Sequence, residues 1–382
     1  MRVLCTGVPA HGHLFPLLPL ARAFRRRGDA VAFLVPEALA PVFAAEGVEV
    51  LAAGPDAPTI LAEVARRTGV DLLTTPTPEA EIEAFAGVRV DLAAEQSLAV
   101  AREWRPDLVV HEPYDFLGPL VAAALAVPAA VVTFGADVSA EFVRPAVATV
   151  ASRYAARGLA WRPADHVLDT CPAALQWDDW QRPAGWLPMR PLAHRAPDGV
   201  LPNRPRPLSG SPGILVTFGT VFTDPVLLSP ILRALSAMGA GLRVTLGFTA
   251  AATDFDVDHS AVVFEEFLPL DELLRGVDAV VTHGGAGTTM GTLAAGLPLV
   301  VTPQGADQSV HAGRAVAAGA AVVLAPDEVT PQSVTEAVRT VLTRPSYRAN
   351  ARRVADQIAA LPSPDDVAAT LASTLAGALN RT

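Results

Sequence analysis

Two histidines stand in a loop whose residue types could carry out acid–base chemistry. His11 and His13 belong to the segment PAHGHLFP at residues 9–16, directly after an apolar run that predicts a strand. A neutral imidazole near pH 7 is well matched to accept the proton of a hydroxyl group as its oxygen attacks another atom. From these residues alone, either histidine could serve as the base.

Carboxylates that could orient such a base follow two other predicted strands. The segment HEPYD at residues 111–115 offers Glu112 and Asp115, either of which could hold the second ring nitrogen of a histidine. Asp115 could instead cap the helix that follows it. Asp137 stands after a third strand, where it could act on a phenolic or carbon acceptor or be an ordinary solvated loop residue.

A glycine-rich turn in the second half of the chain could hold an anion. The segment HGGAGTT at residues 283–289 follows an apolar strand and opens a helix that runs to about Ala295. Glycines let main-chain N–H groups approach a ligand, and a helix N-terminus adds unpaired donors and a positive dipole end. Such donors could stabilise a departing diphosphate without a metal. The turn matches neither the P-loop pattern nor the dinucleotide-binding pattern GxGxxG.

Strands that alternate with helices predict the framework that positions these segments. The predicted strands of the first half are 3–8, 31–35, 48–51, 108–111 and 129–134. Those of the second half are 214–218, 243–246, 262–264, 279–282 and 299–302. This alternation is typical of doubly wound parallel sheets, in which ligands bind at the carboxyl ends of the strands. We therefore expect an α/β fold with two Rossmann-like domains facing across a cleft.

A stretch rich in proline and glycine separates the two halves. No helical or strand period is found between about residues 197 and 213, which favours a linker there. The predicted organisation is an N-terminal domain at 1–196, a linker at 197–212, a second domain at 213–362 and a C-terminal helix at 363–382.

Composition restricts the classes of partner. The chain has 382 residues, of which 51% are hydrophobic and 18% charged, enough for two buried cores. A net charge of -10 gives no attraction for a phosphate backbone, so no nucleic-acid partner is expected. The two cysteines, Cys5 and Cys171, have no metal-binding or redox spacing, and no metal is expected.

One uncharged stretch has the nominal length of a membrane span. Residues 116–135 contain no charge, but Pro119 and Pro128 interrupt them and divide them into a helix and a strand. Buried parallel strands are continuous apolar runs in any case. The N-terminus has no basic-then-apolar signal-peptide layout. We expect a cytoplasmic protein with no membrane partner.

The second-half motif resembles a known family. The run HGGAGTTMGTLAAGLPLVVTPQGADQSVHAGRAVAAGAA, residues 283–321, is similar to the donor-binding signature of the family 1 glycosyltransferases, particularly the bacterial enzymes that glycosylate natural products. The likeness is ordered along the whole chain, from the HGH loop to the C-terminal helix. It implies the GT-B fold, whose C-terminal helix packs back on the N-terminal domain.

The resemblance assigns donor-binding roles by position. His283 and the main chain of the turn would hold the diphosphate, Asp307 and Gln308 would bind sugar hydroxyls, and Phe267, where many members have Trp, would stack on the base. The positions assigned to the donor are Gly12, Gly219, Thr220, Phe267, Leu268, His283, Gly285, Ala286, Gly287, Thr288, Asp307 and Gln308.

The resemblance also favours His13 over His11 as the base, because the family places its base three residues before the proline of this loop. Glu112 fills the slot where most members carry aspartate, and Asp115 is the alternative partner. His11 and Asp137 would then line the acceptor. The acceptor walls are expected in residues 55–89 and 138–186, where the second segment holds Trp161, Trp177, Trp180 and Trp186.

The implied reaction is inverting, metal-independent transfer of a (deoxy)sugar from a nucleoside diphosphate, with thymidine diphosphate (TDP) expected before uridine diphosphate. The acceptor would be a small hydrophobic natural product, and no cofactor beyond the donor is expected. A non-catalytic helper that activates a partner glycosyltransferase is the alternative function. The choice between monomer and homodimer stays open.

Overall fold

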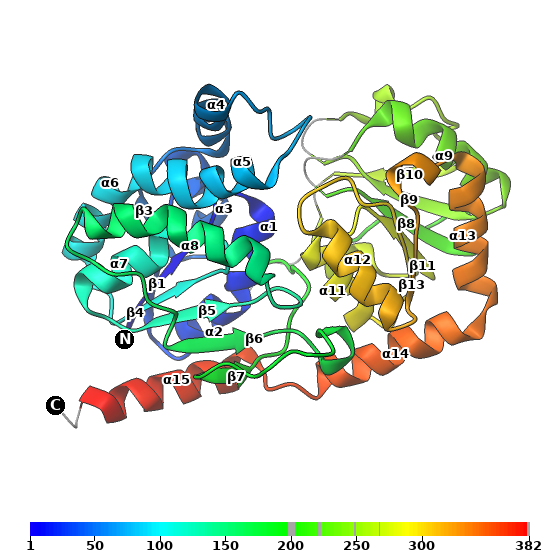
Figure 1. The fold of residues 1–382 in the computed structure, drawn as a ribbon. Helices are drawn as coiled ribbons and strands as arrows, with labels where there is room; N and C mark the ends of the chain where they lie inside the picture. Colours follow the sequence, from blue (N-terminus) through cyan, green and yellow to red (C-terminus); the bar gives the residue numbers. More distant parts are fainter. Residues whose placement is uncertain (198–202, 220–222, 248–249, 267, 380–382) are drawn as a thin grey trace.

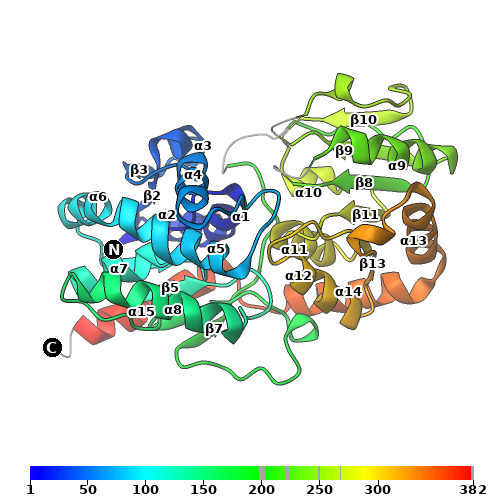
Figure 2. The same ribbon diagram turned by 45° about the horizontal axis from the view of Figure 1, so that its top comes forward.

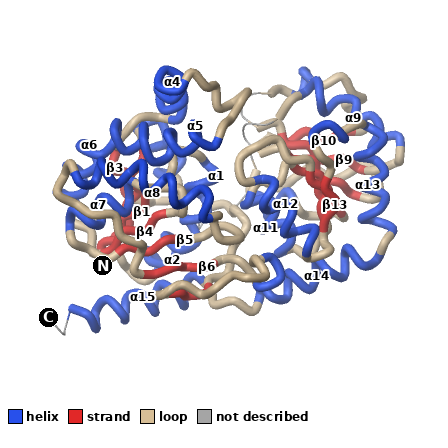
Figure 3. The backbone as a smooth tube through the Cα atoms, viewed as in Figure 1, coloured by secondary structure: helices blue, strands red, loops and turns tan. Residues whose placement is uncertain are grey.

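The computed structural model describes residues 1–197, 203–219, 223–247, 250–266 and 268–379. These residues form two α/β domains that lie side by side, each with a parallel sheet between helices (Figures 1 and 3). The prediction of two doubly wound, parallel-sheet domains is confirmed.

The N-terminal sheet has the order β3-β2-β1-β4-β5-β6-β7, with every pairing parallel in the described part of the chain. Its strands are β1 (Arg2–Thr6), β2 (Ala30–Val35), β3 (Glu49–Ala52), β4 (Leu108–His111), β5 (Ala129–Val132), β6 (His166–Asp169) and β7 (Trp186–Pro188). Alternate residues of β1 enter different cores: Val3 and Cys5 pack on one face of the sheet and Leu4 on the other. Burial on both faces explains why these strands are continuous apolar runs.

Helices cover both faces of this sheet. They are α1 (His11–Leu14), η1 (Phe15–Leu17), α2 (Leu18–Arg26), η2 (Glu37–Leu39), α3 (Ala40–Ala44), α4 (Ala57–Thr68), α5 (Pro78–Ile82), the π-helical segment η3 (Glu83–Val88), α6 (Arg89–Trp104), α7 (Leu117–Leu125), α8 (Ala140–Ala155) and η4 (Ala173–Leu175).

The second sheet has the order β10-β9-β8-β11-β12-β13 and is also parallel throughout its described strands. Its strands are β8 (Gly213–Thr217), β9 (Gly241–Thr245), β10 (Val262–Glu265), β11 (Ala279–Thr282), β12 (Leu299–Val301) and β13 (Ala321–Val323). Its helices are α9 (Pro225–Ala237), η5 (Ala252–Asp254), α10 (Leu270–Leu273), α11 (Ala286–Ala294), α12 (Gln308–Ala317), η6 (Pro326–Glu328), α13 (Pro331–Thr343) and α14 (Pro345–Ala359).

The last helix returns to the N-terminal domain. In the view of Figure 1, α14 lies along the bottom of the second domain, and α15 (Pro364–Leu379) runs along the bottom of the first. Val367, Ala368 and Leu371 of α15 are buried in the same core as β1 and α2. The spacing i, i+1, i+4 places these side chains on one helical face. Burial of that face attaches the C-terminal end of the chain, which follows the second domain, to the first domain.

Some elements are not apparent in the sequence pattern. The strands β6, β7 and β13 are three or four residues long, and Pro188 in β7 is tolerated because that strand lies at the edge of its sheet. Residues 57–68 and 78–104, which overlap the expected acceptor-wall segment 55–89, are helical. In the described part of the chain, no helix is both long and apolar enough to cross a membrane.

Candidate active site

His13 and Glu112 meet where two neighbouring strands end. The pairing of β1 with β4 sets Cys5 beside Val110, so the loops that follow both strands emerge at the same edge of the sheet. There the Nδ1 atom of His13 lies 3.1 Å from the Oε1 atom of Glu112. Gly7 permits this approach, since a Cβ atom at that position would lie 3.3 Å from the Cγ atom of Glu112 and 2.9 Å from a methyl carbon of Leu14.

Main-chain donors fix the Glu112 carboxylate. Its Oε1 atom accepts the Val8 N–H at 3.0 Å, and its Oε2 atom accepts the Tyr114 N–H at 2.7 Å. The side chain is fully buried, so these bonds and the one from His13 satisfy a charge that would be costly if unpaired. A carboxylate only accepts hydrogen bonds. The neutral His13 ring therefore carries its proton on Nδ1 and leaves Nε2 as a proton acceptor.

Burial alone lowers the pKa of His13, but the charge and hydrogen bond of Glu112, together with the charge of Asp307, raise it by more. The net pKa of His13 is above its ordinary value. Asp307 belongs to the second domain, and its charge contributes to the raised pKa of His13. Helix α1 lies on the side of the first domain that faces α11 and α12 (Figures 1 and 2).

Asp115 has different partners. Its carboxylate accepts hydrogen bonds from Thr6, from Arg89 at 3.0 and 3.2 Å, and from the N–H groups of Leu117 and Gly118 at 3.1 Å. Arg89 also donates to the carbonyl of Gly7 at 2.6 Å. Asp115 thus accepts the first N–H groups of α7 and ties the ends of β1 and β4 together, whereas Glu112 is the carboxylate that contacts His13.

Two glycines, one after β8 and one in the turn after β11, pack against the His283 ring. A Cβ atom at Gly219 would lie 2.9 Å from the His283 Cε1 atom, and one at Gly285 would lie 2.8 Å from its Nε2 atom. Gly219 has φ 70°, which also favours glycine. Burial lowers the pKa of His283 to about 4, so its imidazole is neutral at physiological pH.

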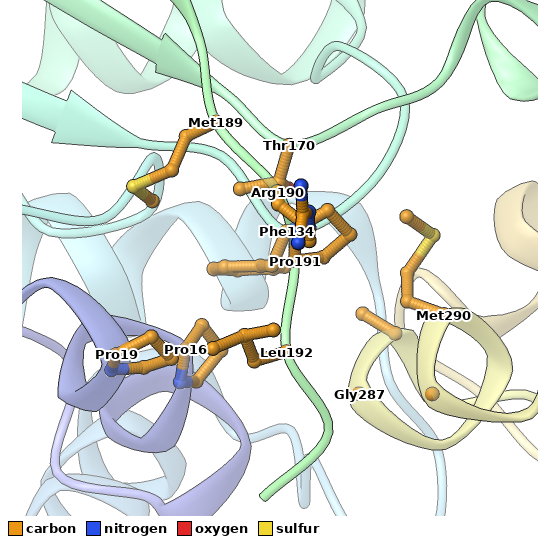
Figure 4. Close-up of a pocket in the computed structure, with 12 residues that line it drawn as sticks. Pro16, Pro19, Phe134, Thr170, Met189, Arg190, Pro191, Leu192, Gly287 and Met290 are labelled. Atoms are coloured by element: carbon orange, nitrogen blue, oxygen red, sulfur yellow. The ribbon is translucent and has the colours of Figure 1, made fainter. Parts of the chain in front are cut away.

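The turn opens directly into α11. Gly285 is the N-cap, so the N–H groups of Ala286, Gly287 and Thr288 lie in the first turn, where a helix has no carbonyl partners for them. A Cβ atom at Gly287 would meet nothing within 4 Å. Figure 4 shows Gly287 and Met290 on one side of a small apolar pocket, with Pro16 and Leu192 opposite. The helix start therefore lies against the N-terminal domain.

Asp307 and Gln308 begin α12. Gln308 is buried, and its side-chain oxygen accepts the N–H groups of Gln304 at 2.7 Å and Gly305 at 3.2 Å. It therefore shapes the 303–308 loop and leaves its NH2 group to donate. Asp307 is partly exposed, and its Oδ2 atom lies 3.1 Å from the His311 Nε2 atom.

The other predicted residues have varied settings. His11 packs edge-on against Phe15 with ring centroids 5.1 Å apart, and Gly12 is exposed. The main chain of Asp137 bonds to Gln176 at 3.3 Å and to the Trp177 indole at 3.0 Å. Leu268 packs beneath the second sheet. Thr220 and Phe267 lie outside the described residues.

The structure shows a group of aromatic side chains around His13 that was not predicted from the sequence. Phe85, Tyr114, Phe134 and Phe142 contact one another, and the first three have centroids 5.6–5.9 Å from the His13 ring. They come from η3, two strand-end loops and α8. The predicted acceptor walls contain Phe85 and Phe142, whereas two of the tryptophans named there have arginine neighbours: Trp177 lies beside Arg314 and Trp186 beside Arg182. For Tyr114 and Phe134, their positions just after strands were the available signal, and Phe85 and Phe142 had none of this kind.

Comparison with known proteins identifies the family. Residues 22–190 match the N-terminal domain of the erythromycin biosynthesis protein CIII-like family, and residues 235–374 match its C-terminal domain. The L-demethylnoviosyl transferase of Streptomyces niveus is 30% identical, covering 98% of both chains. The chain belongs to this family of bacterial natural-product glycosyltransferases.

Solved structures give the same result for the fold. The Streptomyces sp. SF2575 glycosyltransferase SsfS6, complexed with thymidine diphosphate, is 27% identical with a TM-score of 0.79, covering 98% of this chain and 99% of that one. The spinosyn rhamnosyltransferase SpnG, complexed with spinosyn aglycone, is 25% identical with a TM-score of 0.80, covering 97% and 100%. The protein is therefore a glycosyltransferase with the GT-B fold, as the sequence resemblance implied. Among its described residues, no group of three or more His, Cys, Asp or Glu is arranged to hold a metal.

Proposed function

We propose that this glycosyltransferase moves a (deoxy)sugar from TDP to a hydroxyl group of a small hydrophobic natural product, with inversion at the anomeric carbon. The observation that carries the proposal is the His13–Glu112 pair. The ring is held by its Nδ1 atom, its Nε2 atom is the proton acceptor, and the charge of Asp307 reaches it from the donor-side domain. The structures of similar enzymes with thymidine diphosphate and with an aglycone support the choice of substrates.

In the proposed step, the acceptor oxygen attacks the anomeric carbon while its proton passes to Nε2 of His13. The new oxygen–carbon bond forms as the bond to the phosphate oxygen breaks, and the diphosphate leaves with that electron pair. Attack opposite the leaving group inverts the configuration. Glu112 stabilises the imidazolium, and its main-chain hydrogen bonds keep the ring oriented.

In the proposed step, the second domain binds the sugar nucleotide. The N–H groups at the start of α11 and the neutral His283 would donate hydrogen bonds to the diphosphate, where negative charge develops. Asp307 and the NH2 group of Gln308 would bind sugar hydroxyls, as an acceptor and a donor side by side. On this proposal, residues 1–196 bind the acceptor, within reach of the aromatic group, and residues 213–362 bind the donor.

The test combines nucleotide binding with product analysis. Calorimetry with TDP and uridine diphosphate measures the affinity of wild type and His283→Ala. TDP-glucose and a set of phenolic and macrocyclic alcohols are then incubated with wild type and His13→Gln, and the anomeric configuration of any product is read by NMR. Binding of TDP, a product of inverted configuration and at least about a 100-fold loss in His13→Gln are expected. Absence of nucleotide binding would contradict the proposal and favour a helper protein, and retention of configuration would contradict the mechanism.

A further inference from the structure

His311 touches both the donor side and the acceptor side of the cleft. It lies one turn after Asp307 on α12, and its side chain is only 7% exposed. Its Nε2 atom is 3.1 Å from the Asp307 Oδ2 atom. The sequence motif gave this histidine no role, because spacing on a helix does not reveal what the far side of the ring contacts.

The far side of the ring rests on the N-terminal domain. Gly135 follows β5, and a Cβ atom there would lie 2.3 Å from the His311 Cε1 atom and 2.7 Å from Nδ1. The ring thus lies against the main chain of Gly135, where no other residue would fit. One imidazole connects a carboxylate of the second domain to a strand-end loop of the first.

The same helix has another, separate attachment to the first domain. Arg314 donates to the carbonyls of Leu175 and Gln176, and its guanidinium lies 5.1 Å from the Trp177 ring centroid. This contact is one turn further along α12 and bonds to none of the residues proposed to bind the sugar. It accounts for adhesion between the domains, so adhesion alone gives no reason for His311 to hold Asp307.

Asp307 occupies an unusual position for a helix N-cap. Its side chain makes no capping hydrogen bond to α12, although aspartate at this position commonly does. Its Oδ2 atom instead contacts His311. The bond to His311 restricts rotation of the carboxylate, which leaves Oδ1 to accept from a ligand hydroxyl.

We propose that His311 is a positioning residue that aligns Asp307 for the donor sugar while the second domain rests on the Gly135 loop. The inference rests on the proposed function, in which Asp307 binds a sugar hydroxyl. It adds that recognition of the sugar depends on contact between the domains. An ordinary surface pair at i, i+4 would contribute only about 0.5 kcal/mol to stability and would leave ligand recognition unchanged.

Two substitutions separate the contacts of the ring. His311→Phe keeps an aromatic ring against Gly135 but removes the donor to Asp307, and His311→Gln restores an N–H donor. Arg314→Met is the matched control, because it weakens the interdomain contact of the same helix without touching Asp307. Affinities for TDP and for TDP-glucose are measured by calorimetry, and KM and kcat for the sugar nucleotide are measured with an accepted acceptor.

His311→Phe is expected to bind TDP within twofold of wild type, while its affinity for TDP-glucose falls about tenfold, the effect of one charge-assisted hydrogen bond. His311→Gln should recover part of that loss, and Arg314→Met should keep the wild-type ratio of the two affinities. Equal weakening of both ligands by His311→Phe, or no change in either, would overturn the inference. If wild type binds TDP and transfers the sugar in that experiment, the proposed function stands and only the role of His311 fails.

Discussion

The Nδ1 atom of His13, on α1, lies 3.1 Å from the Oε1 atom of Glu112, which comes 99 residues later, just after β4. The N–H groups of Val8 and Tyr114 donate hydrogen bonds to the Glu112 carboxylate, so the pair is oriented before any substrate binds. In this arrangement the charge and hydrogen bond of Glu112 raise the pKa of His13.

Glu112→Gln is therefore expected to reduce kcat by about 100- to 10,000-fold, because the amide neither stabilises the imidazolium nor enforces the tautomer. On the proposed mechanism, wild-type activity requires neutral His13 and should fall as the pH drops through the raised pKa of that residue. Without the Glu112 charge, burial lowers that pKa, so the acid limb of kcat/KM should move to lower pH. A pH–rate profile of both proteins checks this, and an unmoved acid limb would exclude His13 as the titrating base.

Glu112→Asp shortens the side chain that spans from the β4 loop to His13. The hydrogen bonds to Val8 and Tyr114 compete with the one to His13, since a shorter carboxylate cannot reach all three. We expect a loss of kcat smaller than in Glu112→Gln, with nucleotide affinity unchanged. Steady-state kinetics and TDP titration measure the two quantities, and a loss as large as in Glu112→Gln would mean that the exact reach is essential.

Arg89→Met removes the cation that neutralises buried Asp115. The exposed fractions of the two side chains are 3% and 0%, so the remaining carboxylate would be an unpaired buried charge. We expect a loss of about 3–5 kcal/mol in the free energy of unfolding, measured by denaturant titration. Arg66→Met, at a site where the arginine is 70% exposed, should change it by less than about 0.5 kcal/mol. Similar losses in the two variants would contradict a buried structural pair.

Gly287→Ala separates the stability of α11 from its proposed use in binding. Its Cβ atom meets nothing within 4 Å, and alanine favours a helix over glycine by up to about 1 kcal/mol. We expect an unchanged or higher Tm but about tenfold weaker binding of TDP, because the methyl group would occupy space beside the helix start. Gly313→Ala in α12 has equally open surroundings and should leave TDP affinity unchanged. Unaltered affinity in Gly287→Ala would show that the diphosphate does not approach there.

His194 stacks on Phe15 with ring centroids 4.3 Å apart, and burial, followed by the charges of Arg22 and His11, lowers its pKa to about 4. The unfolded chain protonates this imidazole near pH 6.5, whereas the folded chain does not, so stability falls as the pH drops from 6.5 towards 4. His194→Gln should remove about 2 kcal/mol of that loss at pH 5. Denaturant titrations at pH 7.5 and pH 5 measure it, with pH 7.5 as the reference. An identical pH dependence in both proteins would contradict the lowered pKa.

Much of the fold was predictable because strands of a buried parallel sheet are continuous apolar runs in the sequence. The runs 3–5, 108–110 and 279–281 are apolar at every position, since both faces of each sheet are covered. Among the described residues, β7 is an edge strand that pairs with β6 alone, and its side chains are only half buried, so it is not a continuous buried apolar run.

The glycine turn before α11 could be recognised from the sequence alone, because glycines that follow an apolar strand and open a helix form a local pattern. The reason for the glycines is only partly local: Gly285 lies beside His283 in the same turn, whereas a side chain at Gly219 would collide with His283 and one at Gly284 with Val301, from other parts of the chain. The donor-binding roles of the residues in this turn were predicted from the family resemblance, and they stay predictions.

The choice among residues far apart in sequence was made only by the tertiary structure. The pattern HEPYD contains two carboxylates, and the register of β1 against β4 directs Glu112 to His13 while Asp115 turns to Arg89. In the same way, packing of α12 on the first domain brings His311 against Gly135. Local patterns specify backbone conformation and burial, whereas the partner of a polar side chain depends on how separately formed elements dock.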